Sequence, residues 1–221
     1  MTTPLRIAIV GAESTGKTRL VADMATHFRN SGRRVIAVAE ALRDWCEQAG
    51  RTPHAEEQAG IAQAQAAAVD AAASTAGVDT VLADTTPLMV AVYSDLLFAD
   101  RSLYPFALDH QRRYTLTLLT GLDLPWVADG LQRDGPHVRE PVDARVRAAL
   151  DSAAITYQVV YGQGEERLQN ALYAIYSIAK DDHPERTSRL FDSKNGLQVW
   201  SCDTCSDPDC EHRLFTGLLR G

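Results

Sequence analysis

GAESTGKT, at residues Gly11–Thr18, fits the phosphate-binding pattern G-x-x-x-x-G-K-[ST]. The residues before it, 5–10, form a short and mostly apolar run typical of a buried parallel strand. The residues after it, 19–30, carry apolar side chains at helical spacing. A match by chance is the alternative interpretation, but the chain has only three lysines and one of them is Lys17. Because strand, pattern and helix follow in this order, we interpret the stretch as a phosphate-binding loop.

Such a loop holds a nucleotide mainly through its backbone, because successive N–H groups and the helix N-terminus surround the phosphates. Lys17 is expected to contact the β- and γ-phosphates of ATP, and Thr18 to offer its hydroxyl to Mg²⁺. The positions expected to bind the nucleotide are Gly11, Glu13, Ser14, Thr15, Gly16, Lys17 and Thr18.

Length and composition restrict the class of protein. With 221 residues and 45% hydrophobic composition, we expect a kinase-like domain over residues 1–181 and a short tail over 182–221. The formal charge of −7 argues against nucleic acid as the main partner, because a phosphate backbone requires a basic face, although a local basic patch is the alternative. No apolar run is long enough for a membrane span, and nothing before the first strand resembles a signal peptide, so we expect a cytoplasmic protein.

Five strand-like segments alternate with helical segments. The predicted strands are residues 5–10, 34–39, 78–83, 114–119 and 156–161. Helices are predicted over residues 19–30, 54–74, 88–98, 142–150 and 165–179, and residues 102–110 are expected to form an irregular link. Right-handed crossovers then predict an α/β P-loop fold, with a parallel sheet in the order 2-3-1-4-5 and helices on both faces.

Two carboxylates follow predicted strands. Glu40 ends the second strand, with Arg43 and Trp45 after it, and Asp84 ends the third. Ligands bind outside the carboxyl ends of the strands in such sheets, so Glu40 is expected near a phosphoryl acceptor and Asp84 near Mg²⁺. The alternatives are that Glu40 only interacts with a helix dipole and that Asp84 only caps the next helix.

Two glutamines lie in the Ala-rich predicted helix over residues 54–74. Gln63 and Gln65 are candidates to contact a ligand, although a solvated helix face is the alternative. Further along, Arg133 and Arg139 lie on a segment rich in Gly and Pro after the fourth strand. This arrangement suits a lid that closes over triphosphate, with ordinary surface arginines as the alternative.

The tail has a different composition from the rest of the chain. Its potential metal ligands are Cys202, Cys205, Cys210 and His212. Two thiolates spaced Cys-x2-Cys can reach one ion, so these four residues are predicted to bind a structural Zn²⁺. A redox pair, a disulfide or unbound thiols are the alternatives.

Several motifs together resemble the ribosylnicotinamide kinase domain of the NadR family over about residues 5–180. They are GxESTGKT at residues 11–18, E-x-x-R-x-aromatic at residues 40–45, D-T at residues 84–85 and P-W-V-x-D-G-L at residues 125–131. The resemblance implies substrate contacts by Glu40, Arg43, Trp45 and Asp129. It does not extend to the adenylyltransferase and helix-turn-helix regulator of the multifunctional members, and these activities are not expected. Family members sandwich a pyridinium ring between aromatic side chains, where this chain offers Ala39 and Ala66–Ala68.

The expected activity is Mg²⁺- and ATP-dependent phosphorylation of a small nucleoside-like acceptor, foremost the 5′-hydroxyl of nicotinamide riboside. The residues expected to carry it are Lys17, Glu40, Asp84 and Arg133, with either carboxylate as the base. A different class of function, an ATP-binding switch or ATPase that acts through a protein partner, is the alternative, and a homo-oligomer is compatible with either.

Overall fold

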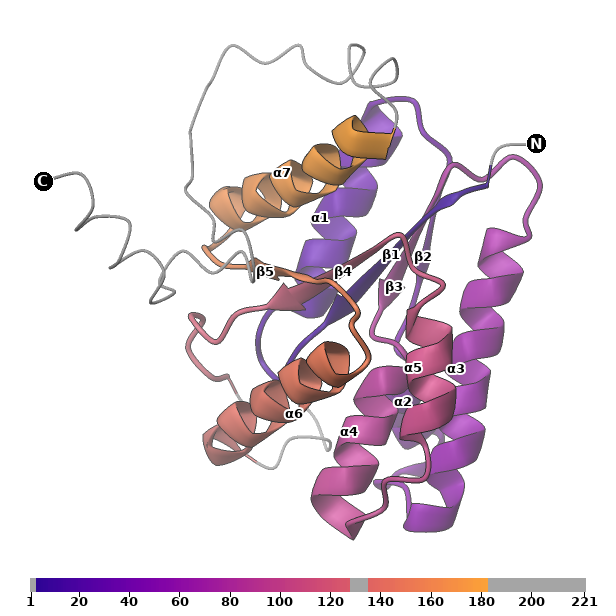
Figure 1. Ribbon diagram of the computed structural model, residues 1–221, viewed down its shortest axis with the longest axis vertical. Coiled ribbons are helices and arrows are strands. Elements are labelled where there is room, and N and C mark those ends of the chain that lie inside the picture. The colour runs from indigo at the N-terminus through magenta and orange to yellow at the C-terminus, as the bar shows by residue number, and fades with distance from the viewer. Residues whose placement is uncertain (1–2, 128–134, 183–221) are drawn as a thin grey trace, which may run out of the picture.

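The computed structural model describes residues 3–127 and 135–182. A parallel sheet of five strands forms its centre, in the order β2-β3-β1-β4-β5 (Figure 1). The strands are β1 (Leu5–Val10), β2 (Val35–Val38), β3 (Thr80–Asp84), β4 (Leu116–Thr120) and β5 (Gln158–Val160). This order is the one predicted from the sequence, so the predicted fold is confirmed. Every strand also lies within two residues of its predicted position.

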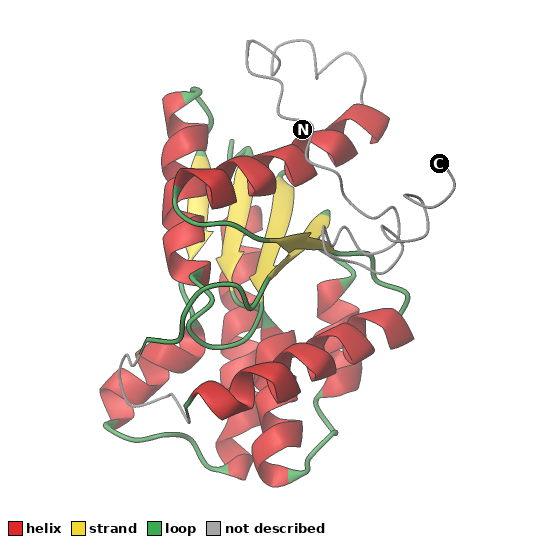
Figure 2. Ribbon diagram, turned by 90° about the vertical axis from the view of Figure 1, so that its left-hand side faces the viewer, coloured by secondary structure: helices red, strands yellow, loops and turns green. Residues whose placement is uncertain are grey.

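Helices cover both faces of the sheet (Figures 1 and 2). One face carries α1 (Lys17–Asn30) and α7 (Glu165–Asp182). The other carries α2 (Ala41–Ala49), α3 (Gln58–Ala73), α4 (Pro87–Phe98), α5 (Tyr104–Gln111) and α6 (Arg139–Ser152), with short 3-10 turns at Ala55–Glu57 and Pro136–Val138. Among the described residues, no helix is both long and apolar enough to cross a membrane.

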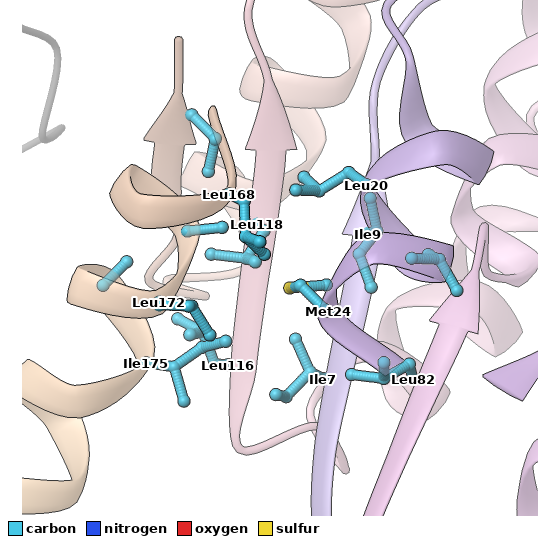
Figure 3. Close-up of a cluster of buried hydrophobic side chains, with 14 of the residues drawn as sticks. Ile7, Ile9, Leu20, Met24, Leu82, Leu116, Leu118, Leu168, Leu172 and Ile175 are labelled. Atoms are coloured by element: carbon cyan, nitrogen blue, oxygen red, sulfur yellow. The ribbon is translucent and has the colours of Figure 1, made fainter. Parts of the chain in front are cut away.

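Alternation along the strands divides the core into two layers. Ile7 and Ile9 of β1 point toward α1 and α7, where they meet side chains such as Met24 and Leu172 (Figure 3). Ala8 and Val10 point to the opposite face, toward α3 and α4. Both faces of β1 are therefore dry from Ile7 to Val10, which explains why this part of the strand is a continuous apolar run.

One predicted element is wrong. The expected irregular link over residues 102–110 is largely the helix α5, Tyr104–Gln111. Pro105 lies in its first turn, where the missing N–H has no intrahelical partner to lose, so this proline starts the helix instead of breaking it. Ala107 and Gln111 bury one side of α5 against the rest of the fold.

Candidate functional site

The phosphate-binding loop connects the carboxyl end of β1 to the first turn of α1. Its backbone enters the left-handed region at Ser14 (φ 56°) and Gly16 (φ 76°). The Thr15 hydroxyl donates to the Ala12 carbonyl over 2.8 Å and lies 2.7 Å from the Thr120 hydroxyl at the end of β4. The loop is therefore attached to the neighbouring strand at the edge of the sheet where ligands are expected.

Gly11 begins the loop with a φ of 145°, a conformation that side chains rarely adopt. A Cβ at this position would also collide with the Thr120 side chain. Lys17 places its ammonium back across the loop, where Nζ donates to the Ala12 carbonyl over 2.7 Å, and Thr18 is exposed in the first helical turn. The glycine thus allows the close approach of β4 that this loop conformation requires.

Glu40 and Asp84 leave the sheet on adjacent strands, because Val38 of β2 pairs with Ala83 of β3. Glu40 Oε2 lies 3.5 Å from Arg43 Nη2, and its side chain is 15% exposed. Burial raises the pKa of the Glu40 carboxyl above its ordinary value, the positive charge of Lys17 opposes this rise, and the negative charge of Asp84 adds to it. Three of the predicted site residues, Lys17, Glu40 and Asp84, therefore interact electrostatically.

Asp84 is buried, and its Oδ1 atom has no hydrogen-bond partner within residues 3–127 and 135–182. The alternative that Asp84 caps the next helix is wrong, because the N-cap of α4 is Thr86. Mg²⁺ prefers oxygen ligands, and the Asp84 carboxylate and the Thr18 hydroxyl are both of this kind. These two side chains fit the role of Mg²⁺ ligands that the loop implies.

Gln65 of α3 connects the two carboxylate-bearing strand ends. Its Oε1 accepts from the Ala41 N–H at 2.6 Å, and its Nε2 donates to the Ala39 carbonyl at 3.2 Å and the Thr85 carbonyl at 3.5 Å. Gln65 is 1% exposed, so both ideas from the sequence, a ligand contact and a solvated face, are wrong for this residue. Its amide instead fixes the backbone on both sides of Glu40.

Thr85 follows Asp84 with a φ of 68°, a strained conformation for a β-branched residue. Its carbonyl is one of the acceptors of the Gln65 amide. Backbone strain of this kind persists only where the surrounding structure enforces it, and it is common at functional sites.

Gln63, the other glutamine that the sequence indicated as a candidate ligand contact, is exposed two residues before Gln65.

A cavity of about 410 Å³ lies beside the phosphate-binding loop. Glu13, Ser14 and Lys17 line it from the loop, and Glu40 and Arg43 line it from the start of α2. Its volume is in the range that small-molecule sites occupy. The structure thus places the residues predicted to bind phosphate and the residues predicted to bind the acceptor around one cavity.

Residues that the sequence did not indicate form the rest of the cavity wall. From α4 these are Met89, Tyr93, Leu97 and Phe98. The first three are spaced four residues apart, so they lie on one helical face, and this spacing is a signal that was present in the sequence. Aromatic side chains therefore enter the cavity from α4, not from the Ala39 and Ala66–Ala68 positions where the family comparison sought them.

The side of the cavity opposite the loop comes from the α2–α3 region. Cys46, His54 and Gln58 line it there. Trp45, a predicted substrate contact, instead packs against Ile61 and Val90 and stacks on the Arg51 guanidinium, 4.9 Å from the ring centre. Among the described residues, its neighbour Cys46 takes the position in the cavity wall.

The predicted lid residues have different outcomes. Arg139 is 8% exposed, and its Nη2 donates to the Leu122 carbonyl over 3.2 Å, so here it is a buried residue at the start of α6. Its contact with phosphate in a closed state stays a prediction. Arg133 and Asp129 lie outside the described residues.

The Ser14 hydroxyl, expected at the phosphates, donates to the Val127 carbonyl at 3.2 Å and accepts from the Val127 N–H at 2.8 Å.

The predicted zinc ligands, Cys202, Cys205, Cys210 and His212, also lie outside the described residues. Within the described ranges no cluster of three or more His, Cys, Asp or Glu side chains could hold a metal ion. The zinc site in the tail therefore stays a prediction.

Arg167 supports the phosphate-binding loop from behind, and the sequence analysis did not single it out. Its guanidinium is buried behind the phosphate-binding loop, where Nη2 donates to the Thr15 carbonyl at 2.9 Å. Nη1 donates to Asp123 Oδ1 at 3.1 Å and to the Gly162 carbonyl at 2.6 Å. An arginine on the apolar face of α7, beside Leu168 and Ala171, was the available signal.

The loop, the strand order and the carboxylates at the strand ends define a P-loop protein. Residues 6–167 match the family described as an AAA domain, and the chain belongs to this family. A search of curated proteins finds no match.

The fold is similar to solved structures of two kinds of protein. A NadR protein in complex with NR has a TM-score of 0.65, and one in complex with NAD and AMP-PNP has 0.63; both are 17% identical and cover 80% of this chain. The chain spans about half the length of these NadR chains, 51% and 49%. A deoxyadenosine kinase from M. mycoides, with dCMP and dCDP bound, has a TM-score of 0.52 at 12% identity, over 78% of this chain and 100% of that one. At such identities the likeness confirms the NadR-like, P-loop kinase-like fold.

Proposed function

We propose that this chain is a Mg²⁺- and ATP-dependent kinase of a small nucleoside-like acceptor, with the 5′-hydroxyl of nicotinamide riboside as the leading candidate. The observation that supports this most is the cavity, which extends from Lys17 of the phosphate-binding loop past Glu40 to the aromatic face of α4. A nucleoside has matching parts, because its hydroxyl suits the charged end and its ring suits the apolar wall. The complexes of the similar proteins, NadR with NR and deoxyadenosine kinase with dCMP, are consistent with this proposal.

In the proposed reaction, positioning and charge neutralisation lower the barrier to phosphoryl transfer. The loop amides and Lys17 hold the β- and γ-phosphates, and Thr18 and Asp84 would hold Mg²⁺, which supplies further neutralising charge. Glu40 lines the cavity, so we assign it the role of orienting the acceptor hydroxyl and accepting its proton. Arg43, 3.5 Å from Glu40, is close enough to bind the acceptor or the transferred phosphate.

The direct test is phosphate transfer from labelled ATP to a panel of nucleosides, separated by chromatography. We expect at least one labelled nucleoside monophosphate with wild-type protein and none with Lys17→Met, which controls for a contaminating kinase. Steady ATP hydrolysis without a labelled acceptor would instead favour the alternative, a nucleotide-dependent switch that acts through a partner.

Gln65 provides a further test of this site. Gln65→Leu removes the three hydrogen bonds that hold the backbone around Glu40 and Thr85. Small displacements of a catalytic group are costly, so we expect kcat to fall roughly 10- to 100-fold with little change in the KM for ATP. Gln63→Leu is the matched control, because Gln63 is exposed on the same helix. Equal kcat values for the two variants would show that Gln65 does not position the site.

A further inference from the structure

Gln58, the first residue of α3, has a buried polar atom that lacks a protein partner. The residue is 3% exposed and lines the cavity, and its Oε1 has no hydrogen-bond partner in the described part of the chain. Leaving such an acceptor unpaired costs about 1–3 kcal/mol, so a buried amide of this kind is expected to meet a partner. Because Gln58 lines the cavity, a donor on a bound ligand can become that partner once the side chain turns toward it.

The position of Gln58 on α3 indicates which part of a ligand it meets. Gln58 and Gln65 are both buried, and their separation of seven residues places them on the same helical face, roughly 10 Å apart along the axis. Gln65 is hydrogen-bonded to Ala41 and Thr85, the residues that directly follow Glu40 and Asp84, so it lies at the strand ends that carry the two carboxylates. If the reacting hydroxyl lies at Glu40, Gln58 lies two helical turns away, at the end of the cavity where the ring of a nucleoside would reach.

The surroundings of Gln58 fit a flat ring with a polar edge. Met89, Tyr93 and Leu97 of α4 line the same cavity as Gln58 and give its wall an aliphatic and aromatic surface. A primary amide both accepts and donates, so a glutamine can pair with a carboxamide or with an exocyclic amine beside a ring nitrogen.

We propose that Gln58 determines acceptor specificity by pairing with an amide or amine on the ring of the nucleoside, an inference that rests on the proposed function. The acceptor class is then a nucleoside whose base carries a carboxamide or an exocyclic amine. A ring with an ionised carboxylate lacks the N–H that Oε1 accepts and adds charge to a largely buried wall. A ring with no substituent leaves the amide unpaired.

The test compares dissociation constants by isothermal titration calorimetry in the presence of Mg²⁺ and AMP-PNP, so it does not depend on turnover. Two ligand pairs isolate the ring substituent: nicotinamide riboside with nicotinic acid riboside, and adenosine with purine riboside. In at least one pair, we expect wild-type protein to bind the amide or amine member about 10- to 100-fold more tightly. We expect this preference to fall to about twofold or less in Gln58→Leu.

Two further variants complete the design. Gln58→Glu keeps an accepting oxygen, so we expect it to retain part of the preference for adenosine over purine riboside. Gln63→Leu, exposed on the same helix, should behave as wild type. Equal binding within both pairs by wild type, no binding of any of the four, or an undiminished preference in Gln58→Leu would overturn the inference. Selective binding without phosphate transfer would support the assignment of Gln58 and overturn the kinase proposal alone.

Discussion

Glu40→Gln is expected to lower kcat for phosphoryl transfer by roughly 10²- to 10⁴-fold, because the amide keeps the shape of the side chain but cannot accept a proton. ATP binding should persist, since the phosphate-binding loop and Asp84 are unchanged. Steady-state kinetics with the acceptor that the nucleoside panel identifies would measure kcat, and calorimetry with AMP-PNP would measure nucleotide affinity. Glu47→Gln is the matched control, because Glu47 is exposed on the same helix, α2.

The raised pKa of Glu40 gives this prediction a pH signature. The carboxylate is the active form, so kcat/KM should fall as the pH drops through a pKa above the ordinary value for glutamate. The stability effect has the opposite sign. A carboxyl whose pKa is higher in the folded than in the unfolded protein stabilises the fold at low pH and loses that contribution as the pH rises. Glu40→Gln should therefore unfold at higher urea concentration than wild type at neutral pH.

A full kcat in Glu40→Gln would contradict this assignment. A loss in Asp84→Asn is expected in either case, because Asp84 is also assigned to Mg²⁺, so only a full kcat in Glu40→Gln would transfer the role of base to Asp84. The two carboxylates interact, so both variants should be measured. An unchanged urea midpoint for Glu40→Gln at neutral pH would show that burial of the carboxylate costs less than the structure indicates.

Residue patterns predicted the fold because each element has a local signal. The strands are apolar runs that end at turn residues, and parallel strands place all their carboxyl ends at one edge, so Glu40 and Asp84 could be assigned to one site in advance. Helix α5 was not predicted because proline occurs both in turns and in the first turn of a helix, so Pro105 did not distinguish the two.

The cavity walls were harder to predict because they depend on how each helix is rotated about its axis. Met89, Tyr93 and Leu97 share a face, but only packing of α4 against the sheet decides that this face lines a cavity. On α2, Cys46 faces the cavity and the larger Trp45 does not. Arg139 shows the same limit, since its burial against the Leu122 carbonyl has no signal in the sequence.

Arg167→Ala is expected to lower the free energy of unfolding by about 2–4 kcal/mol, because hydrogen bonds to a charged group contribute about 1.5–3 kcal/mol and buried carbonyl acceptors would lose a donor. Its side chain is 5% exposed, and Asp123 lies 3.1 Å away. Arg167 also donates to the carbonyls of Thr15 and Gly162, which belong to the phosphate-binding loop and to the turn after β5. Loss of this one guanidinium removes a donor from acceptors in three loops, while Asp123 keeps the Gly162 N–H that donates to its Oδ2 at 2.7 Å.

Urea denaturation would measure the change, with Arg101→Ala as the matched control. The Arg101 side chain is 77% exposed and lies 3.3 Å from Asp95, so its removal should change the free energy of unfolding by no more than about 0.5 kcal/mol. Arg167→Lys should recover only part of the loss, since one ammonium cannot replace both arms of the planar guanidinium. A drop of less than about 1 kcal/mol in Arg167→Ala would contradict the role of Arg167 as the connection between the loops. If the connection exists, Arg167→Lys should also bind AMP-PNP more weakly than Arg101→Ala, because the Thr15 carbonyl that Arg167 holds lies within the phosphate-binding loop itself.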